Sequence, residues 1–122
     1  MSSLEKLSLD CNLLTVVPEG MHELPSLRFL NLSSNKIASR GTGFTKFPPR
    51  DARERLIALS LMPKVETLLL SGNVLEEIPP DMCALSTLTE LGIGNNRISE
   101  LPREIIHLTR LTSLNVDRCQ TL

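Results

Sequence analysis

VETLLLSGNVL, residues 65–75, is the stretch of the sequence that decides the fold. Leu68 and Leu70 alternate with residues of the other face, and this period of two predicts a short strand with one buried face. Asn73 follows at the point where the chain turns away from that strand. A buried amide at this point can bond backbone groups of its own turn and of a neighbouring turn that would otherwise lack hydrogen-bond partners.

The same pattern recurs four more times along the chain. The other copies are LEKLSLDCNLL from Leu4, LRFLNLSSNKI from Leu27, LTELGIGNNRI from Leu88 and LTSLNVDRCQT from Leu111. Their asparagine position is held by Asn12, Asn35, Asn96 and, in the last copy, Cys119. A single unit of this kind cannot bury its apolar face alone, so we expect the units to stack and their strands to form a parallel sheet.

The second halves of three units share the pattern hPxxhxxLxxL, where h is apolar, in VPEGMHELPSL, IPPDMCALSTL and LPREIIHLTRL. Together with LxxLxLxxNxL, this pattern resembles the leucine-rich-repeat family, in the intracellular class found in Ras-pathway scaffolds and Roco-type proteins. The resemblance covers nearly the whole chain. It implies an α/β fold, a curved right-handed leucine-rich-repeat solenoid with a parallel sheet on its concave face and short helices or irregular turns on its convex face. Residues 1–122 are predicted to form one domain of five repeats, which start near residues 4, 27, 65, 88 and 111.

One interval between repeats is 38 residues long instead of 23, so it holds 15 extra residues. These extra residues fall within residues 38–64, a segment with six basic and two acidic side chains. Because the whole chain carries −1, the segment carries +4 (six minus two) and the remainder −5. The second repeat thus contains a basic insert in an otherwise acidic chain.

Within the insert, residues 49–61 are predicted to form a helix of the convex wall, because Pro49 suits a helix start and an apolar stripe follows at helical spacing. Arg50, Arg53 and Arg55 give this helix a basic face. Two interpretations are open: the face is simply solvated, or it is a docking patch for an acidic partner. Nucleic acid is not the expected partner, because the chain has no Tyr or Trp for base stacking.

The chain shows no constellation of catalytic residues. His22 and His107 are its only histidines, and they lie far apart on the outer segments, so no nucleophile and base can be paired with either. RGTGFTK, residues 40–46, lacks the GxxxxGK[ST] spacing of a phosphate-binding loop. We therefore expect no enzymatic activity and no cofactor.

The number and spacing of the three cysteines bear on metal binding and on the redox environment of the protein. Cys11, Cys83 and Cys119 occupy different positions of the repeat, so we expect no metal site. They form no CxxC or capping cluster, and an odd number cannot all pair, which indicates a reducing, cytoplasmic location. No apolar run approaches the ~20 residues that cross a bilayer, so we expect no membrane contact.

The outward positions of the predicted strands should form three columns across the repeats. The first is Lys6, Phe29, Thr67, Glu90 and Ser113; the second is Ser8, Asn31, Leu69, Gly92 and Asn115; the third is Asp10, Ser33, Ser71, Gly94 and Asp117. Most of these residues are small or polar, whereas Phe29 and Leu69 are large, apolar and on adjacent repeats. Such a pair suits partner binding, and the alternative is that the loop of the insert covers it.

The sequence therefore predicts a non-catalytic scaffold that presents the concave sheet and the basic insert to a protein partner. The candidate partner-binding residues are Phe29, Asn31, Leu69, Glu90 and Asn115 on the sheet and Arg50, Arg53 and Arg55 on the insert. The alternative is a regulatory repeat segment of a larger signalling enzyme, a GTPase or a kinase. Both ends of the repeat array look cut, so we also expect edge-to-edge self-association through open sheet edges.

Overall fold

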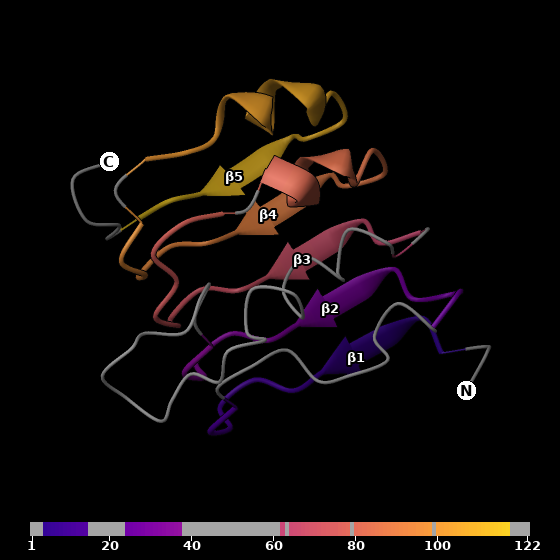
Figure 1. The fold of residues 1–122 in the computed structure, drawn as a ribbon. Helices are drawn as coiled ribbons and strands as arrows, with labels where there is room; N and C mark the ends of the chain where they lie inside the picture. Colours follow the sequence, from indigo (N-terminus) through magenta and orange to yellow (C-terminus); the bar gives the residue numbers. More distant parts are fainter. Residues whose placement is uncertain are drawn as a thin grey trace.

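The structure, a computed structural model, describes residues 4–14, 24–37, 62, 64–78, 80–98 and 100–117. It contains a five-stranded sheet whose strands follow one another in chain order (Figure 1). The strands are β1 (Lys6–Ser8), β2 (Phe29–Asn31), β3 (Thr67–Leu69), β4 (Glu90–Gly92) and β5 (Ser113–Asn115). Each strand begins two residues after one of the predicted repeat starts.

All neighbouring strands are parallel, and equivalent positions of successive repeats lie side by side. Phe29 pairs with Thr67, Leu30 with Leu68, and Asn31 with Leu69, and the other strand pairs keep the same register. The predicted parallel solenoid is therefore confirmed. The register also places the first two predicted columns of outward residues across the sheet as expected.

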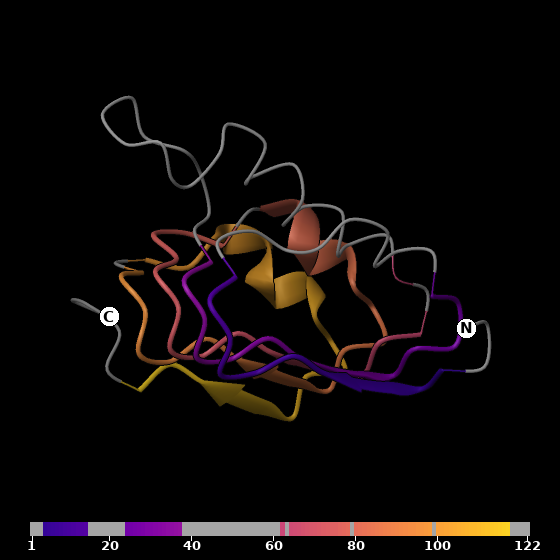
Figure 2. The same cartoon turned by 90° about the horizontal axis from the view of Figure 1, so that it is seen from below.

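Two short 3₁₀ helices, η3 (Pro80–Ala84) and η4 (Arg103–His107), pack against each other on one side of the sheet. Figure 2 shows the strands and these helices as two separate layers, with both helices on the same side of the sheet. The predicted helix 49–61 and the basic side chains Arg50, Arg53 and Arg55 lie outside the described residues.

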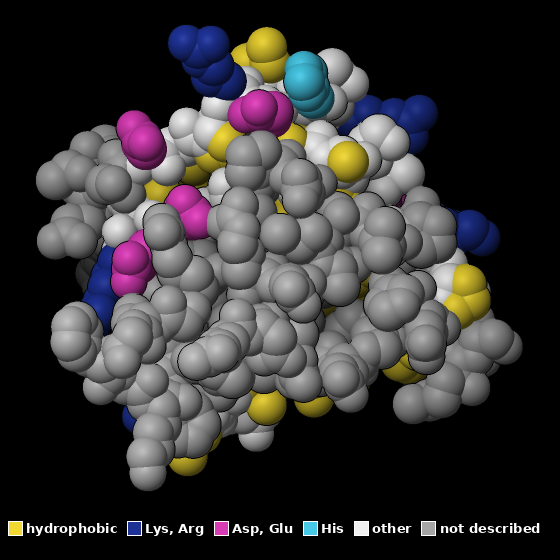
Figure 3. All heavy atoms as spheres, in the orientation of Figure 1, with side chains coloured by type: hydrophobic (Ala, Val, Ile, Leu, Met, Phe, Trp, Pro, Cys, Tyr) yellow, Lys and Arg dark blue, Asp and Glu magenta, His cyan; other side chains and the backbone are white. Residues whose placement is uncertain are grey.

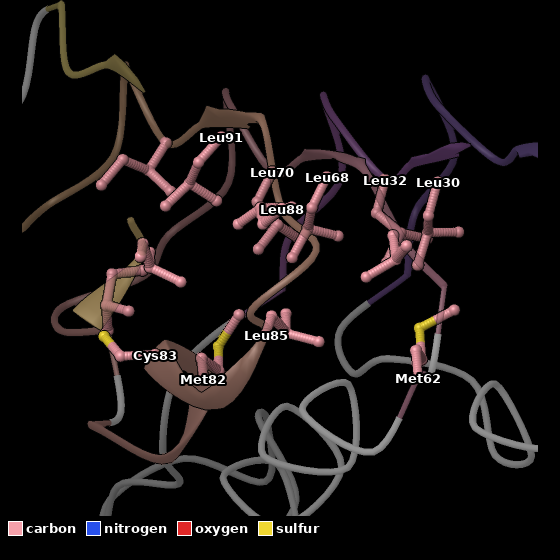
Figure 4. Close-up of a cluster of buried hydrophobic side chains, with 14 of the residues drawn as sticks. Leu30, Leu32, Met62, Leu68, Leu70, Met82, Cys83, Leu85, Leu88 and Leu91 are labelled. Carbon is pink, nitrogen blue, oxygen red and sulfur yellow. The ribbon is translucent and has the colours of Figure 1, made fainter. Parts of the chain in front are cut away.

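The core fills the space between these layers. The central residue of β2, β3 and β4 is a fully or almost fully buried leucine, Leu30, Leu68 or Leu91. Figure 4 shows these leucines projecting from the strands toward the other layer, with Leu68 on the side of Met82 and Leu85 and Leu30 opposite Met62. At the last strand the equivalent Leu114 is 38% exposed, because no further turn packs on it within the described residues.

Buried asparagines connect the turns where the chain leaves each strand. Asn73 donates from Nδ2 to the carbonyl of Leu70 in its own turn (2.9 Å) and to that of Leu32 in the preceding turn (3.0 Å). Its Oδ1 accepts the N–H of Ile37 at 2.9 Å. The same arrangement, with one amide bonding two turns, recurs at Asn35 and Asn96. The predicted role of this position is thus confirmed for three residues, while Cys119 lies outside the described part of the chain.

The residue before each of the four asparagines at this repeat position, Asn12 included, has a left-handed backbone. The φ angles are 59° at Cys11, 58° at Ser34, 71° at Gly72 and 52° at Asn95. Each of these residues donates its N–H to a carbonyl of the next turn at 2.6 to 3.1 Å, for example Ser34 to Ser71 at 2.8 Å. Glycine and asparagine adopt such angles readily, whereas serine and cysteine do so at a steric cost. The repeat therefore imposes a left-handed backbone at this position, whichever residue occupies it.

Truncating a core leucine should destabilise the protein more at an inner strand than at the terminal strand. Leu68→Ala should lower the free energy of unfolding by about 2 to 5 kcal/mol, because it leaves a cavity in a closely packed interior. Leu114→Ala, at the equivalent position of β5, should cost no more than about 1 kcal/mol because water already reaches it. Urea unfolding followed by circular dichroism measures both, and equal losses would contradict the described packing.

Removal of an inner asparagine should be almost as costly as removal of a leucine. Asn73→Ala should destabilise by about 2 to 4 kcal/mol, because the buried N–H of Ile37 loses its acceptor and two buried carbonyls each lose a donor. Asn12→Ala is the matched control, since Asn12 is exposed and water can replace its bonds. The same unfolding measurement should show a loss below about 1 kcal/mol for this control.

Glycine at the left-handed position should stabilise the fold. Ser34→Gly should raise the free energy of unfolding by about 0.5 to 1 kcal/mol, because glycine adopts φ near 58° without strain. Ser33→Gly should lower it by about the same amount, since Ser33 has an ordinary φ and glycine only adds entropy to the unfolded chain. Thermal and urea unfolding of both variants measure these changes. The change in the free energy of unfolding must be positive for Ser34→Gly and negative for Ser33→Gly.

Candidate functional site

The side of the sheet that faces away from η3 and η4, called the open sheet face below, holds the three columns predicted from the sequence. It consists of Lys6, Phe29, Thr67, Glu90, Ser113; Ser8, Asn31, Leu69, Gly92, Asn115; and Asp10, Ser33, Ser71, Gly94, Asp117. In β2 and β3 the outward residues are half-buried while the central leucine is buried. This alternation arises because successive side chains of a strand point to opposite faces.

Phe29 lies in the first column and carries a cation on its ring. The ammonium Nζ of Lys6, on the neighbouring strand β1, is 4.8 Å from the centroid of the Phe29 ring. A lysine at this distance is attracted by the negative face of the ring, by about 0.5 to 1 kcal/mol at an exposed site. Phe29 is half-buried, so it offers only part of its ring to a partner, with Lys6 beside it.

Leu69 lies diagonally next to Phe29 and leans over the following strand. A Cβ atom built on Gly92 would lie 3.1 Å from Cδ2 of Leu69 and 3.2 Å from Oγ of Ser71, so Gly92 leaves the room that Leu69 occupies. Leu69 is also half-buried. Phe29 and Leu69 thus occupy diagonal positions of adjacent strands. Phe29 has Lys6 of β1 over its ring, and Leu69 occupies the space left by Gly92 of β4.

Two asparagines of the second column are oriented by their own strand ends. Oδ1 of Asn31 accepts the N–H of Ser33 at 3.0 Å, and Oδ1 of Asn115 accepts the N–H of Asp117 at 3.0 Å. Neither Nδ2 group donates a hydrogen bond within the described ranges of the chain. Each amide therefore presents two donors in a fixed direction, which suits contact with a carbonyl or carboxylate oxygen.

The structure brings together Phe29, Asn31 and Leu69 on adjacent strands, and it places Glu90 and Asn115 further along the same face. Arg50, Arg53 and Arg55 lie outside the described residues, so their position relative to this face stays a prediction. Sequence reasoning did not single out Lys6 as a site residue. The signal was present, because the register that pairs Lys6 with Phe29 follows from their common repeat position.

Exposed apolar side chains also occur away from the open sheet face. Leu13 is 78% exposed in the loop after Asn12, and Ile106 is 75% exposed on η4. Figure 3 views the molecule as Figure 1 does, and apolar, acidic and basic side chains of the described residues are all visible on that face. Scattered single apolar residues of this type are normal on protein surfaces.

The described residues do not assemble a reactive centre. No group of three or more His, Cys, Asp or Glu side chains that could hold a metal ion occurs among them. Burial raises the pKa of the Cys83 thiol, and the nearby Glu104 carboxylate raises it further. A thiol with a raised pKa is a poor nucleophile at neutral pH. Across the same described ranges, none of the helices has the length and apolar character needed to cross a membrane.

Comparison with known families places this geometry in a wider group. A family model described as Leucine rich repeat matches residues 1–37 and 63–120, and a second model of the same description matches residues 26–49. Among curated proteins, osteomodulin of Bos taurus is 31% identical over 100 residues. The matched region is 82% of this chain and 20% of osteomodulin.

Solved structures share the fold over most of the chain. A leucine-rich-repeat protein of Leptospira interrogans superposes with a TM-score of 0.75 at 30% identity, covering 94% of this chain and 26% of its own. The internalin InlF of Listeria monocytogenes gives 0.73 at 25% identity, with 98% and 29% covered. The plant peptide hormone receptor RGFR1, solved in complex with RGF2, gives 0.68 at 30% identity, with 91% and 16% covered.

The chain spans less than a third of the length of each of these relatives. The agreement nevertheless extends to the residues that define the repeat, since the family model includes all five strands. Because that model matches well over half of the residues and the solenoid is shared with solved structures of the same kind, the chain belongs to the leucine-rich-repeat family.

Proposed function

We propose that this chain is a non-catalytic module that binds a protein partner through its open sheet face. The observation that carries the proposal is that Phe29 and Leu69, two large apolar side chains at diagonal positions of adjacent strands, remain partly exposed on an otherwise small and polar surface. Repeat solenoids use extended sheet surfaces of this kind for binding. The relative RGFR1, solved with RGF2, is a peptide hormone receptor, which supports a protein or peptide as the class of partner.

The physical form of the face supports the same proposal. Nζ of Lys6 lies over the Phe29 ring, and Leu69 occupies the space left by Gly92, so each apolar side chain already has a neighbour on the face before a partner covers it. Apolar anchors that are already ordered and surrounded by polar groups are typical of the centre of an interface. The Nδ2 groups of Asn31 and the more distant Asn115 supply polar contacts at its margin.

Two further elements of the proposal concern the insert and the location. Arg50, Arg53 and Arg55 would serve as a second contact for an acidic region of the partner. A cytoplasmic location is proposed from the cysteines, since the described Cys11 and Cys83 are both free thiols. A regulatory segment of a larger signalling enzyme is compatible with the same binding face, but no described residue favours it over a separate module.

The proposal predicts that shortening Phe29 and Leu69 weakens partner capture. The double variant Phe29→Ala with Leu69→Ala should lose at least about tenfold in affinity for a captured protein, because each central anchor of an interface contributes more than about 1 kcal/mol. The measurement is affinity capture from cell lysate with quantitative mass spectrometry, followed by titration of the captured protein against the purified variants.

The matched control is Leu13→Ala with Ile106→Ala, which removes two exposed apolar side chains elsewhere on the molecule. This control should capture the partner as the unchanged chain does, and circular dichroism should show that both double variants are folded. A third variant, in which Arg50, Arg53 and Arg55 are all changed to Ser, tests the insert and should weaken capture. Equal capture of the partner by the Phe29/Leu69 variant and by its control would reject the proposed function.

A further inference from the structure

The first two columns of the open sheet face carry one positive and one negative side chain, Lys6 and Glu90, and their other residues are uncharged. Both side chains belong to exposed residues. In the part of the chain that the structure describes, the ion pairs join Arg28 to Glu5 at 3.4 Å and to Glu66 at 2.6 Å. One arginine thus pairs with two carboxylates just before the strands, whereas none of the ion pairs within the described residues involves Lys6 or Glu90.

The two charges flank the apolar pair. Lys6 is on β1 and Glu90 is on β4, three strand positions apart in the sheet. At ~4.8 Å between strands their backbones are separated by roughly 14 Å. Phe29 and Leu69 come from the two strands in between, β2 and β3. Across the strands the face therefore presents a cation, an apolar centre and an anion in that order.

Other carboxylates of the face do not change this order. Asp10 and Asp117 belong to the third column, at the far margin of the face. Asp10 is four residues after Lys6, beyond the end of β1, which corresponds to at most ~13 Å of extended chain. Nζ of Lys6 instead lies 4.8 Å from the centroid of the Phe29 ring, and within the described residues no carboxylate forms an ion pair with it.

The backbone of the sheet restricts how a partner can lie on this face. The strands β2, β3 and β4 each pair with a neighbour on both sides, so their N–H and C=O groups bond within the sheet. A partner that lies on the face cannot add to this ladder and has to be recognised by side chains. A segment that crosses the strands meets all three features in turn.

From this arrangement we infer that the open sheet face recognises an extended segment that crosses the strands and carries an acidic, an apolar and a basic residue at positions i, i+2 and i+4. Alternate side chains of an extended chain point to the same side, and four residues advance it by ~14 Å, which matches the separation of Lys6 and Glu90. The acidic residue meets Lys6, the apolar residue meets Phe29 and Leu69, and the basic residue meets Glu90. This inference rests on the proposed function and names the chemistry of the partner.

Three peptides with different charge patterns test the inference. Their cores are Glu-Ser-Leu-Ser-Arg, Arg-Ser-Leu-Ser-Arg and Glu-Ser-Leu-Ser-Glu, each biotinylated and presented on a tetramer so that avidity raises weak binding to a measurable level. The unchanged chain should prefer the first peptide. Lys6→Glu should shift the preference to the peptide with two arginines, and Glu90→Lys to the peptide with two glutamates. Each shift should be roughly threefold to tenfold and should shrink as salt is added.

The peptides with two arginines or two glutamates carry the same charge at both ends. The shifts expected for Lys6→Glu and Glu90→Lys therefore do not depend on the direction in which the peptide lies. The controls Lys36→Glu and Glu100→Lys change the net charge equally at exposed residues outside the three columns, and they should keep the preference of the unchanged chain. A third control, the variant Phe29→Ala with Leu69→Ala, should bind all three peptides less.

The outcomes separate this inference from the proposed function. Peptide binding that is lost with the Phe29/Leu69 variant but does not follow the charges at Lys6 and Glu90 would overturn the inference and leave the proposed function intact. Shifts of equal size in the Lys36 and Glu100 controls would overturn it as well, because they would reflect net charge alone. Failure of all three tetramers to bind the unchanged chain would also reject the charge pattern, whereas the proposed function is judged by the capture experiment.

Discussion

The buried amide that follows each strand is the interaction on which the rest of the structure depends. The leucines of the core supply a strong but non-directional driving force, which by itself does not decide how one turn sits on the next. The amides of Asn35, Asn73 and Asn96 do decide it, because each bonds carbonyls of two successive turns and accepts an N–H from the preceding loop. Loops without regular hydrogen bonds are in this way tied to the sheet, and turns can stack in only one register.

That register turns positions of the repeat into neighbours in space. A slip of one residue would exchange the buried and the outward side chains of a strand, so the leucine at its centre would face solvent. With the register fixed, Lys6 reaches the ring of Phe29, and Leu69 reaches the space above Gly92. The contacts of Lys6 with Phe29 and of Leu69 with Gly92 therefore depend on the hydrogen bonds of the asparagines that follow the strands. None of these asparagines takes part in the contacts themselves.

The sequence predicts this arrangement well where one repeat position has one structural role. The strands, the buried leucines and the bonding of the asparagines all follow from the spacing of the repeat. The left-handed residue before each asparagine was not predicted, because Cys11, Ser34, Gly72 and Asn95 share no chemical property that reveals a common backbone angle. The contacts of Lys6 and Leu69 were missed for a different reason, since they depend on side-chain conformations that a column of residue names does not contain.

The choice of partner must depend on side chains of the open sheet face and not on the shared backbone. Solved structures that superpose on most of this chain share its backbone at 25 to 30% identity, so the solenoid itself cannot distinguish their partners. The hydrogen bonds of the inner strands are satisfied within the sheet, which leaves a partner only side chains to recognise. On the open sheet face those side chains are mostly small, so the few large or charged ones dominate the contact. A cation held on an aromatic ring, an apolar centre and an anion, spaced at the pitch of the strands, would then select a partner by the order of its charges.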